Sequence, residues 1–319
     1  AGLFKKNKVD HFFGEAKFVN NKTIEVNQKK FKADKILIAT GSVPSTIPGI
    51  DIDEKNIVSS TGALEFEKVP KKLAVIGGGY IGLELGSVWK RLGADVTVIE
   101  FSDTLVPTMD KDIAKIFHST LTKQGINFML STKVEGALNK KEKVQINCLN
   151  LLNNKSEILD FDKVLVAVGR KPFTDGLGLE NLNIKINKNG TIDVDKNFQT
   201  NIEGIYAIGD VISGPMLAHK ASSEGHVFAE QLLGNKPEVN YQCIPAVVYT
   251  EPEVAWVGPS ERELETKKIA YKKGIFPFSA NARGKTTGDT IGSIKFLSDK
   301  DNDKVLAVHI IGAHAGELI

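Results

Sequence analysis

The sequence predicts an α/β fold followed by a smaller α+β module. Two short apolar runs, Leu73–Ile76 and Val96–Ile99, flank a glycine-rich turn and a helical pattern, which is the order of a parallel strand–helix–strand unit. Strands continue to alternate with helical segments as far as residue 233. From about residue 244 the composition changes to short strands grouped around one helix. The chain of 319 residues has room for two or three domains.

The segment before this unit is predicted to consist mainly of strands. Residues 1–10 have the pattern of a helix end, and alternating strands are expected at 11–20 and 23–27. A buried strand is expected at Lys35–Thr40, where Gly41 ends it. Because the chain opens on the last turns of a helix, we expect the sequence to continue before residue 1.

Gly77, Gly79 and Gly82 follow the first strand of the unit with the spacing G-x-G-x-x-G. In such a turn the first glycine permits the sharp bend, the second leaves room for a pyrophosphate, and the third lets the helix pack closely on the strand. The free N–H groups at the helix start attract phosphate. The stretch therefore predicts a dinucleotide site, and a glycine-rich turn without a ligand is the alternative.

Glu100 ends the second strand, 23 residues after Gly77. At about this distance an acidic side chain accepts hydrogen bonds from the ribose 2′-OH of NAD. A carboxylate would repel the 2′-phosphate of NADP, and Phe101–Val106 contains no Lys or Arg to reverse this. The sequence therefore predicts NAD as the nucleotide.

The helix after the glycines is predicted to bury one apolar face and to end at Gly93. Glu84 lies on that face, where a carboxylate is costly unless it is paired. Two interpretations stay open: Glu84 is an ion-pair partner beside the nicotinamide, or it is a rim residue that reaches solvent. The predicted face is formed by Ile81, Leu85, Val88 and Leu92.

The chain after Glu100 is predicted to continue this alternation. An amphipathic helix is expected at Asp110–Gln124, and a second helix at Leu217–Leu233 begins behind Gly214–Pro215. Strands are expected at 127–130, 162–168, 191–194 and 204–208, with a β-meander over 134–159. In the C-terminal module we expect strands at 245–249, 255–258, 291–297 and 305–311 and a helix at 260–266. A further helix begins at Ala315, so we expect the sequence to continue beyond residue 319.

Composition argues against several other classes of protein. The net charge is only +2, so the chain lacks the basic footprint of a nucleic-acid-binding protein. Its apolar runs are too short to cross a membrane. Cys148 and Cys243 are 95 residues apart without metal-ligand spacing, which indicates two free thiols and no metal site.

Several motifs together resemble those of the two-dinucleotide-fold flavoprotein disulfide reductases, and they span most of the chain. GPMLAHKA (214–221) combined with PAVVYTEPEVAWVG (245–258) is most similar to the dihydrolipoamide dehydrogenase branch of that family. The other matching stretches are IATGSVP (38–44), the glycine unit at 71–100, LVAVGRKPFT (165–174) and TNIEGIYAIGDV (200–211).

The resemblance implies two Rossmann-like dinucleotide-binding domains, for FAD and NAD, and a C-terminal α+β dimerisation domain. Residues 1–69 and 170–243 would form the FAD-binding domain, and 244–319 the dimerisation domain. Residues 70–169 would form the NAD-binding domain, which is long enough to have a core of its own.

The resemblance also assigns residues to the two cofactor sites. Glu84 would pair with a lysine near the flavin and support catalysis, and the helix that starts at Leu217 would point its dipole at the flavin. The implied NAD site comprises Gly77, Gly78, Gly79, Tyr80, Ile81, Gly82, Leu83, Glu84, Glu100, Val134 and Gly169. The implied FAD site comprises Gly14, Ala16, Thr40, Gly41, Ser42, Asp210, Met216, Leu217, Ala218 and His219.

The sequence departs from the family at its catalytic motifs. The redox C-x-x-x-x-C, the first glycine motif for FAD and the His-Pro-Thr segment with its His–Glu pair do not occur in it. We expect these parts to lie beyond the two ends of the sequence, and the chain by itself to be inactive.

The resemblance implies an enzyme that reoxidises dihydrolipoyl groups and passes electrons through a disulfide and FAD to NAD+. Its partners would be the dihydrolipoyl groups of 2-oxo acid dehydrogenase complexes or of the glycine cleavage system, its assembly a homodimer and its location the mitochondrial matrix. The alternatives are another flavoprotein disulfide reductase and a non-catalytic nucleotide-binding module.

Overall fold

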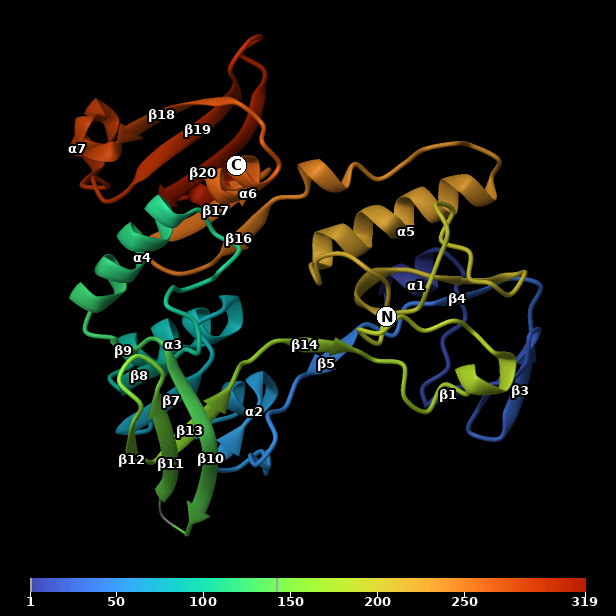
Figure 1. Ribbon diagram of the computed structural model, residues 1–319. Coiled ribbons are helices and arrows are strands. Elements are labelled where there is room, and N and C mark those ends of the chain that lie inside the picture. Colours follow the sequence, from blue (N-terminus) through green and yellow to red (C-terminus); the bar gives the residue numbers. More distant parts are fainter. Residues whose placement is uncertain (1, 142) are drawn as a thin grey trace. The chain divides into compact units, whose positions relative to one another are not determined.

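The computed structural model describes residues 2–141 and 143–319, which form two compact units (Figure 1). The first unit combines the described residues up to Val43 with Arg170–Val239, and the second combines Pro44–Gly169 with Asn240–Ile319. Residues 44–69, which the sequence analysis placed in the first domain, thus lie in the second unit. The reason is that β6 (Ile57–Val58) joins the sheet of that unit, pairing in parallel with Val164 and Leu165.

The first unit contains an antiparallel sheet of order β1-β2-β3, a parallel β15–β4 pair and the helix α5. Its apolar core includes Phe18, Ile38, Ile205 and Phe228. The elements of this unit, with β5 reaching its border, are α1 (Gly2–Lys6), β1 (Ala16–Asn20), β2 (Thr23–Val26), β3 (Lys29–Lys32), β4 (Ile36–Ile38), β5 (Ser42–Pro44), β14 (Arg170–Pro172), η1 (Leu179–Leu182), β15 (Ile205–Ala207), η2 (Gly209–Val211) and α5 (Ala218–Leu232).

Two strand predictions in this unit were wrong or incomplete. The strand expected at 191–194 is reduced to two isolated bridges of Ile192, to Ile186 and to Ile212, because its neighbours do not pair to extend either bridge into a ladder. The strand expected at 11–20 begins only at Ala16, and β3 was not predicted.

The second unit is organised around a five-stranded parallel sheet of order β6-β13-β7-β8-β9. Leu73 and Val75 face the helices on one side, whereas Ala74 and Ile76 face the β10-β11-β12 meander on the other. The elements, apart from β6, are α2 (Ser60–Leu64), β7 (Lys72–Ile76), α3 (Tyr80–Arg91), β8 (Asp95–Ile99), α4 (Lys111–Lys123), β9 (Asn127–Met129), β10 (Thr132–Lys140), β11 (Lys143–Asn150), β12 (Lys155–Phe161) and β13 (Lys163–Val166).

The buried face of α3 differs from the predicted one. Val88 and Leu92 are 43% and 56% exposed, whereas Leu83 and Trp89 are buried. The helix instead turns its glycines to the sheet, where a Cβ on Gly86 would lie 3.5 Å from Val75 Cγ2. The pattern of large apolar residues could not reveal this face, because the residues that allow close packing have no side chain.

The rest of the second unit is the C-terminal module, an antiparallel sheet of order β16-β17-β20-β19-β18. β18 and α7 were not predicted from the sequence. The elements are η3 (Tyr241–Cys243), β16 (Ala246–Val248), β17 (Glu253–Val257), α6 (Glu261–Thr266), β18 (Tyr271–Pro277), η4 (Phe278–Ala280), α7 (Ala282–Thr287), β19 (Ser293–Asp299), β20 (Val305–Gly312) and α8 (Ala315–Leu318).

One apolar core joins the parallel sheet to the C-terminal module. Val248 and Trp256 of the module belong to the same buried cluster as Leu83 of α3 and Phe117 of α4, and α4 lies between the two sheets (Figure 1). The cluster on the helix side of the parallel sheet is thus shared with the module, whereas the cluster on the meander side is formed by residues 47–166 alone. No described helix has the length and apolarity that a membrane span requires.

Candidate functional site

The glycine turn between β7 and α3 is shaped by contacts that only glycine permits. Gly77 has φ +108°, and a Cβ there would lie 2.4 Å from the carbonyl oxygen of Ala167. A Cβ on Gly82 would lie 2.2 Å from the Gly77 carbonyl oxygen. By contrast, a Cβ on Gly79 would meet no atom within 4 Å, so the space beside this residue is open. The geometry matches the spacing: Gly77 makes the turn, Gly82 permits close packing, and Gly79 leaves an open approach.

The N-terminus of α3 is free to receive an anion. Its N-cap is Gly79, which has no side chain to cap the helix, and the first turn contains no acidic residue. The first N–H groups of a helix lack partners within the helix and carry the positive end of its dipole. The end of α3 can therefore hold a phosphate group.

Glu100 is fixed directly against the glycine turn. Its carboxylate accepts hydrogen bonds from the Gly78 N–H at 2.6 Å and from the Ser102 N–H at 2.8 Å, one on each oxygen. Because a carboxylate oxygen can accept more than one hydrogen bond, both oxygens can still receive ribose hydroxyls. The half-buried carboxylate thus lies at the carboxyl end of β8, beside the phosphate-binding turn.

The site lies at the point in the parallel sheet where the order of the strands reverses. β7 leads to β8 and β9 on one side and has β13 on the other, so the crevice at its carboxyl end is the switch point at which α/β sheets bind ligands. Gly169 follows β13, with φ +115° and open space at its Cβ position. Val134 lies two residues after Thr132, whose N–H donates a hydrogen bond to the Glu100 carbonyl oxygen. This hydrogen bond ties the start of β10 to the end of β8.

Some predicted NAD residues can contribute only their backbone. The side chains of Leu83 and Val134 are buried in apolar cores, at 0% and 8% exposure. Tyr80 is half-buried, and its hydroxyl lies 3.3 Å from the Thr108 hydroxyl. Burial raises the pKa of this phenol, so it stays protonated near neutral pH.

Glu84 has a partner that neither sequence interpretation included. It is half-buried, and its Oε1 accepts a hydrogen bond from the backbone N–H of Tyr249 at 2.8 Å. Burial raises the pKa of Glu84, and the hydrogen bond offsets this only in part. The carboxylate is therefore held against the C-terminal module.

In the first unit, the structure brings Ser42 and Asp210 together, whereas the Thr40 hydroxyl donates to the Phe173 carbonyl oxygen at 2.7 Å. The Ser42 hydroxyl donates to Asp210 Oδ2 at 2.5 Å and accepts from Arg170 Nε at 2.6 Å. The Arg170 Nη2 donates to the Ser42 carbonyl oxygen, also at 2.6 Å. Sequence reasoning assigned no role to Arg170, although an arginine directly after Gly169 in a chain with few arginines was a usable signal.

The start of α5 lies close to Asp210 along the chain. Leu217 is its N-cap without a side-chain cap, Met216 is half-buried, and Ala218 and His219 are exposed. A fully buried ion pair, Lys220–Glu224 at 3.1 Å, ties this helix to η2. Lys220 donates to the Gly209 carbonyl oxygen at 2.9 Å, while Glu224 accepts from the Gly209 N–H at 2.7 Å.

The pair was missed from the sequence, although opposite charges at i and i+4 on a helix are its signal. Through Gly209 it fixes the turn that carries Asp210.

Gly14 lies two residues before β1, and Ala16 is the first residue of that strand. A Cβ on Gly14 would lie 2.6 Å from Asn27 Nδ2, and Ala16 pairs with Val26 of β2. Both contacts are to the end of β2 and the residue after it, and neither involves Ser42 or Asp210.

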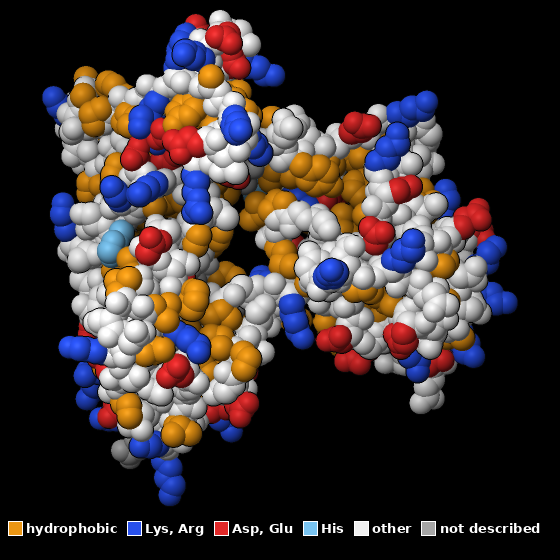
Figure 2. Space-filling view, viewed as in Figure 1, with side chains coloured by type: hydrophobic (Ala, Val, Ile, Leu, Met, Phe, Trp, Pro, Cys, Tyr) orange, Lys and Arg blue, Asp and Glu red, His pale blue; other side chains and the backbone are white. Residues whose placement is uncertain are grey.

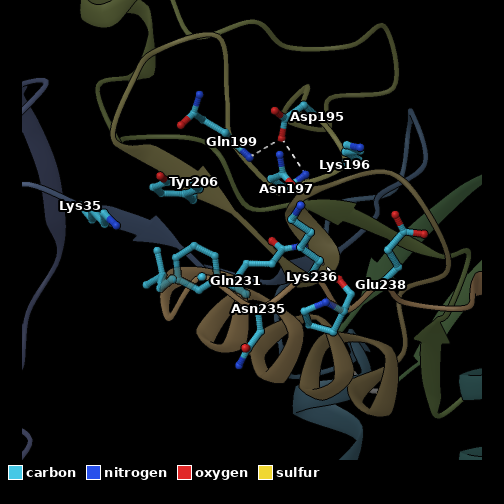
Figure 3. A pocket seen from close by; sticks show the side chains of 14 residues that line it. Lys35, Asp195, Lys196, Asn197, Gln199, Tyr206, Gln231, Asn235, Lys236 and Glu238 are labelled. Carbon is cyan, nitrogen blue, oxygen red and sulfur yellow. Dashed lines mark hydrogen bonds between the residues drawn. The ribbon is translucent and has the colours of Figure 1, made fainter.

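A cavity of about 540 Å³ in the first unit is distinct from both groups (Figure 3). The loop Asp195–Gln199, the Tyr206 ring and the end of α5 enclose it. Its lining includes none of the residues that the sequence predicted for a cofactor.

Three carboxylates in the second unit have the spacing of a metal site but hold a lysine. Lys295 Nζ lies 2.6 Å from Asp110 Oδ1 and 2.8 Å from Asp112 Oδ2, and it also pairs with Glu261. The buried Lys295 ammonium thus takes the place that a cation would fill, and Lys273, 3.1 Å from Glu261 Oε1, adds a second positive charge beside the three carboxylates. On the visible surface, acidic and basic side chains are interspersed (Figure 2).

Comparison with known proteins identifies the family. The family model described as pyridine nucleotide-disulphide oxidoreductase matches residues 1–225, and its dimerisation domain matches residues 244–319. The chain belongs to the pyridine nucleotide-disulphide oxidoreductase family. The predicted fold class, two dinucleotide-binding domains and a dimerisation domain, is thereby confirmed.

Within this family, the chain is similar to enzymes named dihydrolipoyl dehydrogenase. The chain is 49% identical over 323 residues to a mitochondrial dihydrolipoyl dehydrogenase of Caenorhabditis elegans, which covers 99% of the chain and 65% of the relative. For the Homo sapiens enzyme of the same name the identity is 48% over 326 residues, covering 100% and 64%. The chain thus spans about 65% of the length of these relatives.

Solved structures show the same fold. A Cu(II) complex of the flavoprotein disulfide reductase RclA from Escherichia coli superposes with a TM-score of 0.90 at 27% identity, covering 99% of this chain and 73% of that one. LpdA from Mycobacterium tuberculosis has a TM-score of 0.85 at 25% identity, with coverage of 93% and 65%.

Proposed function

We propose that the chain provides the NAD- and FAD-binding parts of a dihydrolipoyl dehydrogenase, which reoxidises dihydrolipoyl groups with NAD+. The observation that carries the proposal is the Glu100 carboxylate held 2.6 Å from the Gly78 N–H at the switch point. Identity of 49% to a dihydrolipoyl dehydrogenase over nearly the whole chain supports the choice of reaction. FAD, when bound, supplies two-electron transfer between a dithiol and NAD+.

The NAD site is assigned to residues 70–169. The N–H groups at the start of α3 would bind the pyrophosphate, and the open space at Gly79 would admit it. Glu100 would accept hydrogen bonds from the adenosine ribose, which selects NAD over NADP by repelling a 2′-phosphate. Gly169 and the backbone near Val134 would complete the edge of the crevice.

Glu84 would act beside the nicotinamide. One carboxylate oxygen is engaged by the Tyr249 N–H, so the second oxygen can face a cation or a polar hydrogen. Its raised pKa reflects burial, and a positive partner near the flavin would reverse that shift. The proposal therefore keeps the ion-pair interpretation of Glu84, with its second oxygen as the acceptor.

The FAD site would lie in the first unit, within the ranges 1–69 and 170–243 that the sequence analysis gave to the FAD-binding domain. Asp210 and Ser42 form a hydrogen-bonded pair that can accept hydroxyl groups of the ribitol chain. The uncapped start of α5, at Met216–His219, would place a helix dipole near the flavin and stabilise negative charge on the reduced ring. Gly14 and Ala16 would contribute from the start of β1.

We propose a homodimer formed through residues 244–319, the range that matches the family's dimerisation domain. The partners would be the dihydrolipoyl groups of 2-oxo acid dehydrogenase complexes or of the glycine cleavage system. The location would be the mitochondrial matrix, as the names of the relatives suggest.

The test replaces the aligned segment of the Caenorhabditis elegans enzyme with this chain and measures dihydrolipoamide oxidation. We expect a flavin-containing chimaera that reduces NAD+ and hardly reduces NADP+. The same chimaera with Asp210→Ala should retain less flavin. A flavin-loaded chimaera that reduces another disulfide substrate but not lipoamide would favour a different disulfide reductase, to which the likeness to RclA also points.

A further inference from the structure

The start of α3 is attached to the C-terminal module. The Tyr80 ring stacks on the Trp256 ring, with centroids 5.7 Å apart and planes inclined by 26°. One turn further along α3, Glu84 accepts the hydrogen bond from the Tyr249 N–H. Both contacts join the first turns of the helix to strands or turns of a module about 170 residues away in the sequence.

Tyr80 occupies a critical place in the dinucleotide site. It is the first residue of α3, directly after the N-cap Gly79, so its backbone N–H belongs to the group that faces a bound phosphate. On its other side the hydroxyl lies 3.3 Å from Thr108, in the segment that follows Glu100. The ring is thus held between the module and the segment that follows Glu100.

Trp256 is a rigid support for this ring. It is only 7% exposed and lies in β17, where Ala246 of β16 is its neighbour on one side and His309 of β20 on the other. An aromatic ring enclosed in this way has little freedom to move, so the position of Tyr80 follows that of the module's sheet.

We propose that Trp256 is a positioning residue for the dinucleotide: it holds Tyr80, and thereby the first N–H groups of α3, in the direction that binds the pyrophosphate. The C-terminal module is then part of the nucleotide site as well as the part of the chain that matches a dimerisation domain. This inference rests on the proposed NAD-binding function.

The test measures binding of NADH and of ADP-ribose to the chain by fluorescence and calorimetric titration. Trp256→Leu and Tyr80→Leu should each weaken both ligands by about three- to tenfold, because either change removes the stacked pair. The double variant should lose no more affinity for either ligand than a single Leu variant does. Trp256→Phe and Tyr80→Phe keep two stacked rings and should restore most of the affinity.

Trp89→Phe is the matched control for stability. Trp89 lies near the other end of α3 and donates a hydrogen bond to the Ala63 carbonyl oxygen. This variant should melt at a lower temperature but bind both ligands as the wild type does.

Three outcomes would overturn the inference. The first is a wild type that binds NADH while both Leu variants bind equally well. The second is additive losses in the double variant. The third is loss of NADH affinity with unchanged ADP-ribose affinity, which would mean that the stack serves the nicotinamide half. Failure of the wild type to bind NADH would instead overturn the proposed function, and this inference with it.

Discussion

At the scale of single residues, the most informative side chain is Glu100, because the two oxygens that hold the glycine turn are also the ones proposed to bind the ribose. It anchors the Gly78 and Ser102 N–H groups and remains able to accept ribose hydroxyls. Glu100→Ala should weaken NADH binding by about 1–3 kcal/mol, because charged hydrogen bonds are lost. The same substitution should also reduce the ratio of NADH affinity to NADPH affinity. Titration of the chain with both nucleotides measures the two effects.

The control for Glu100 is Asp103→Ala. Asp103 is an exposed carboxylate in the same segment, so its removal changes the net charge by the same amount. We expect nucleotide binding to remain as in the wild type. A wild-type chain with equal affinity for NADH and NADPH would show that Glu100 does not select the nucleotide.

At the scale of elements, α3 is positioned by glycines that differ in what surrounds them. A Cβ on Gly86 would be in ordinary contact, 3.5 Å from Val75 and 3.6 Å from Val96. Gly86→Ala should therefore stabilise the chain by about 0.5–1 kcal/mol, since alanine is the better helix former. A Cβ on Gly82 would lie 2.2 Å from the Gly77 carbonyl oxygen, so Gly82→Ala should destabilise the chain by about 1–3 kcal/mol and impair NADH binding.

Urea denaturation of the two alanine variants gives these free energies directly. They form a matched pair, because the same methyl group is added one turn apart on the same helix. Destabilisation of similar size in both would contradict the packing that the structure assigns to α3.

The same helix shows what the sequence could and could not reveal. The spacing of Gly77, Gly79 and Gly82 located the turn and the helix, because backbone geometry there depends on glycine alone. Which face of α3 is buried could not be predicted, since Gly82 and Gly86, which contact Val75 of the sheet, add no large apolar side chain to the pattern. Nor could the sequence reveal the partner of Glu84, because Tyr249 approaches it only through the tertiary fold. The strand at 191–194 was misjudged because a strand needs a ladder, and Ile192 has only isolated bridges.

At the scale of the whole second unit, Lys295 joins α4 to the C-terminal module. Burial by itself would lower the pKa of Lys295, but its hydrogen bonds to Asp110, Asp112 and Glu261 outweigh this and raise it. The hydrogen bond from Lys295 lowers the pKa of Asp112. Burial would raise the pKa of Glu261, yet bonds from Lys295, Tyr271 and Lys273 lower it. The neighbouring His309, whose pKa burial lowers, remains neutral near pH 7.

These shifts fix the pH range in which the network stabilises the chain. A carboxylate whose pKa is lowered by folding contributes its full stabilisation at pH values above its ordinary pKa, which is 3.8 for Asp112. This stabilisation is lost as the pH falls through the lower pKa of the folded state. The contribution of Lys295 is present below its ordinary value of 10.5 and is lost as the pH rises through the raised pKa. Stability from the network should therefore be constant around neutral pH.

Asp112→Asn should reduce the loss of stability in acid, since one of the groups that must be protonated is gone. Asp112 is 42% exposed, so solvent screens its share and the effect should be small. Urea denaturation at pH 3, 4 and 7 measures it, with the exposed Asp103→Asn as the control that leaves the curve unchanged. An acid limb identical in Asp112→Asn and the wild type would contradict the assigned pairing.

The shared core makes the second unit depend on both of its segments. Val248, Trp256 and Ile311 of the C-terminal module are buried against Leu83 and Phe117. A fragment of residues 44–169 would expose that apolar surface and leave Asp110 without Lys295, so we expect it to aggregate, to bind a hydrophobic dye and to melt without a sharp transition. The complete chain is the control and should melt cooperatively in this unit. A monomeric fragment with a sharp melting transition and wild-type NADH affinity would show that the module is dispensable, and it would also remove the basis for assigning Trp256 to the nucleotide site.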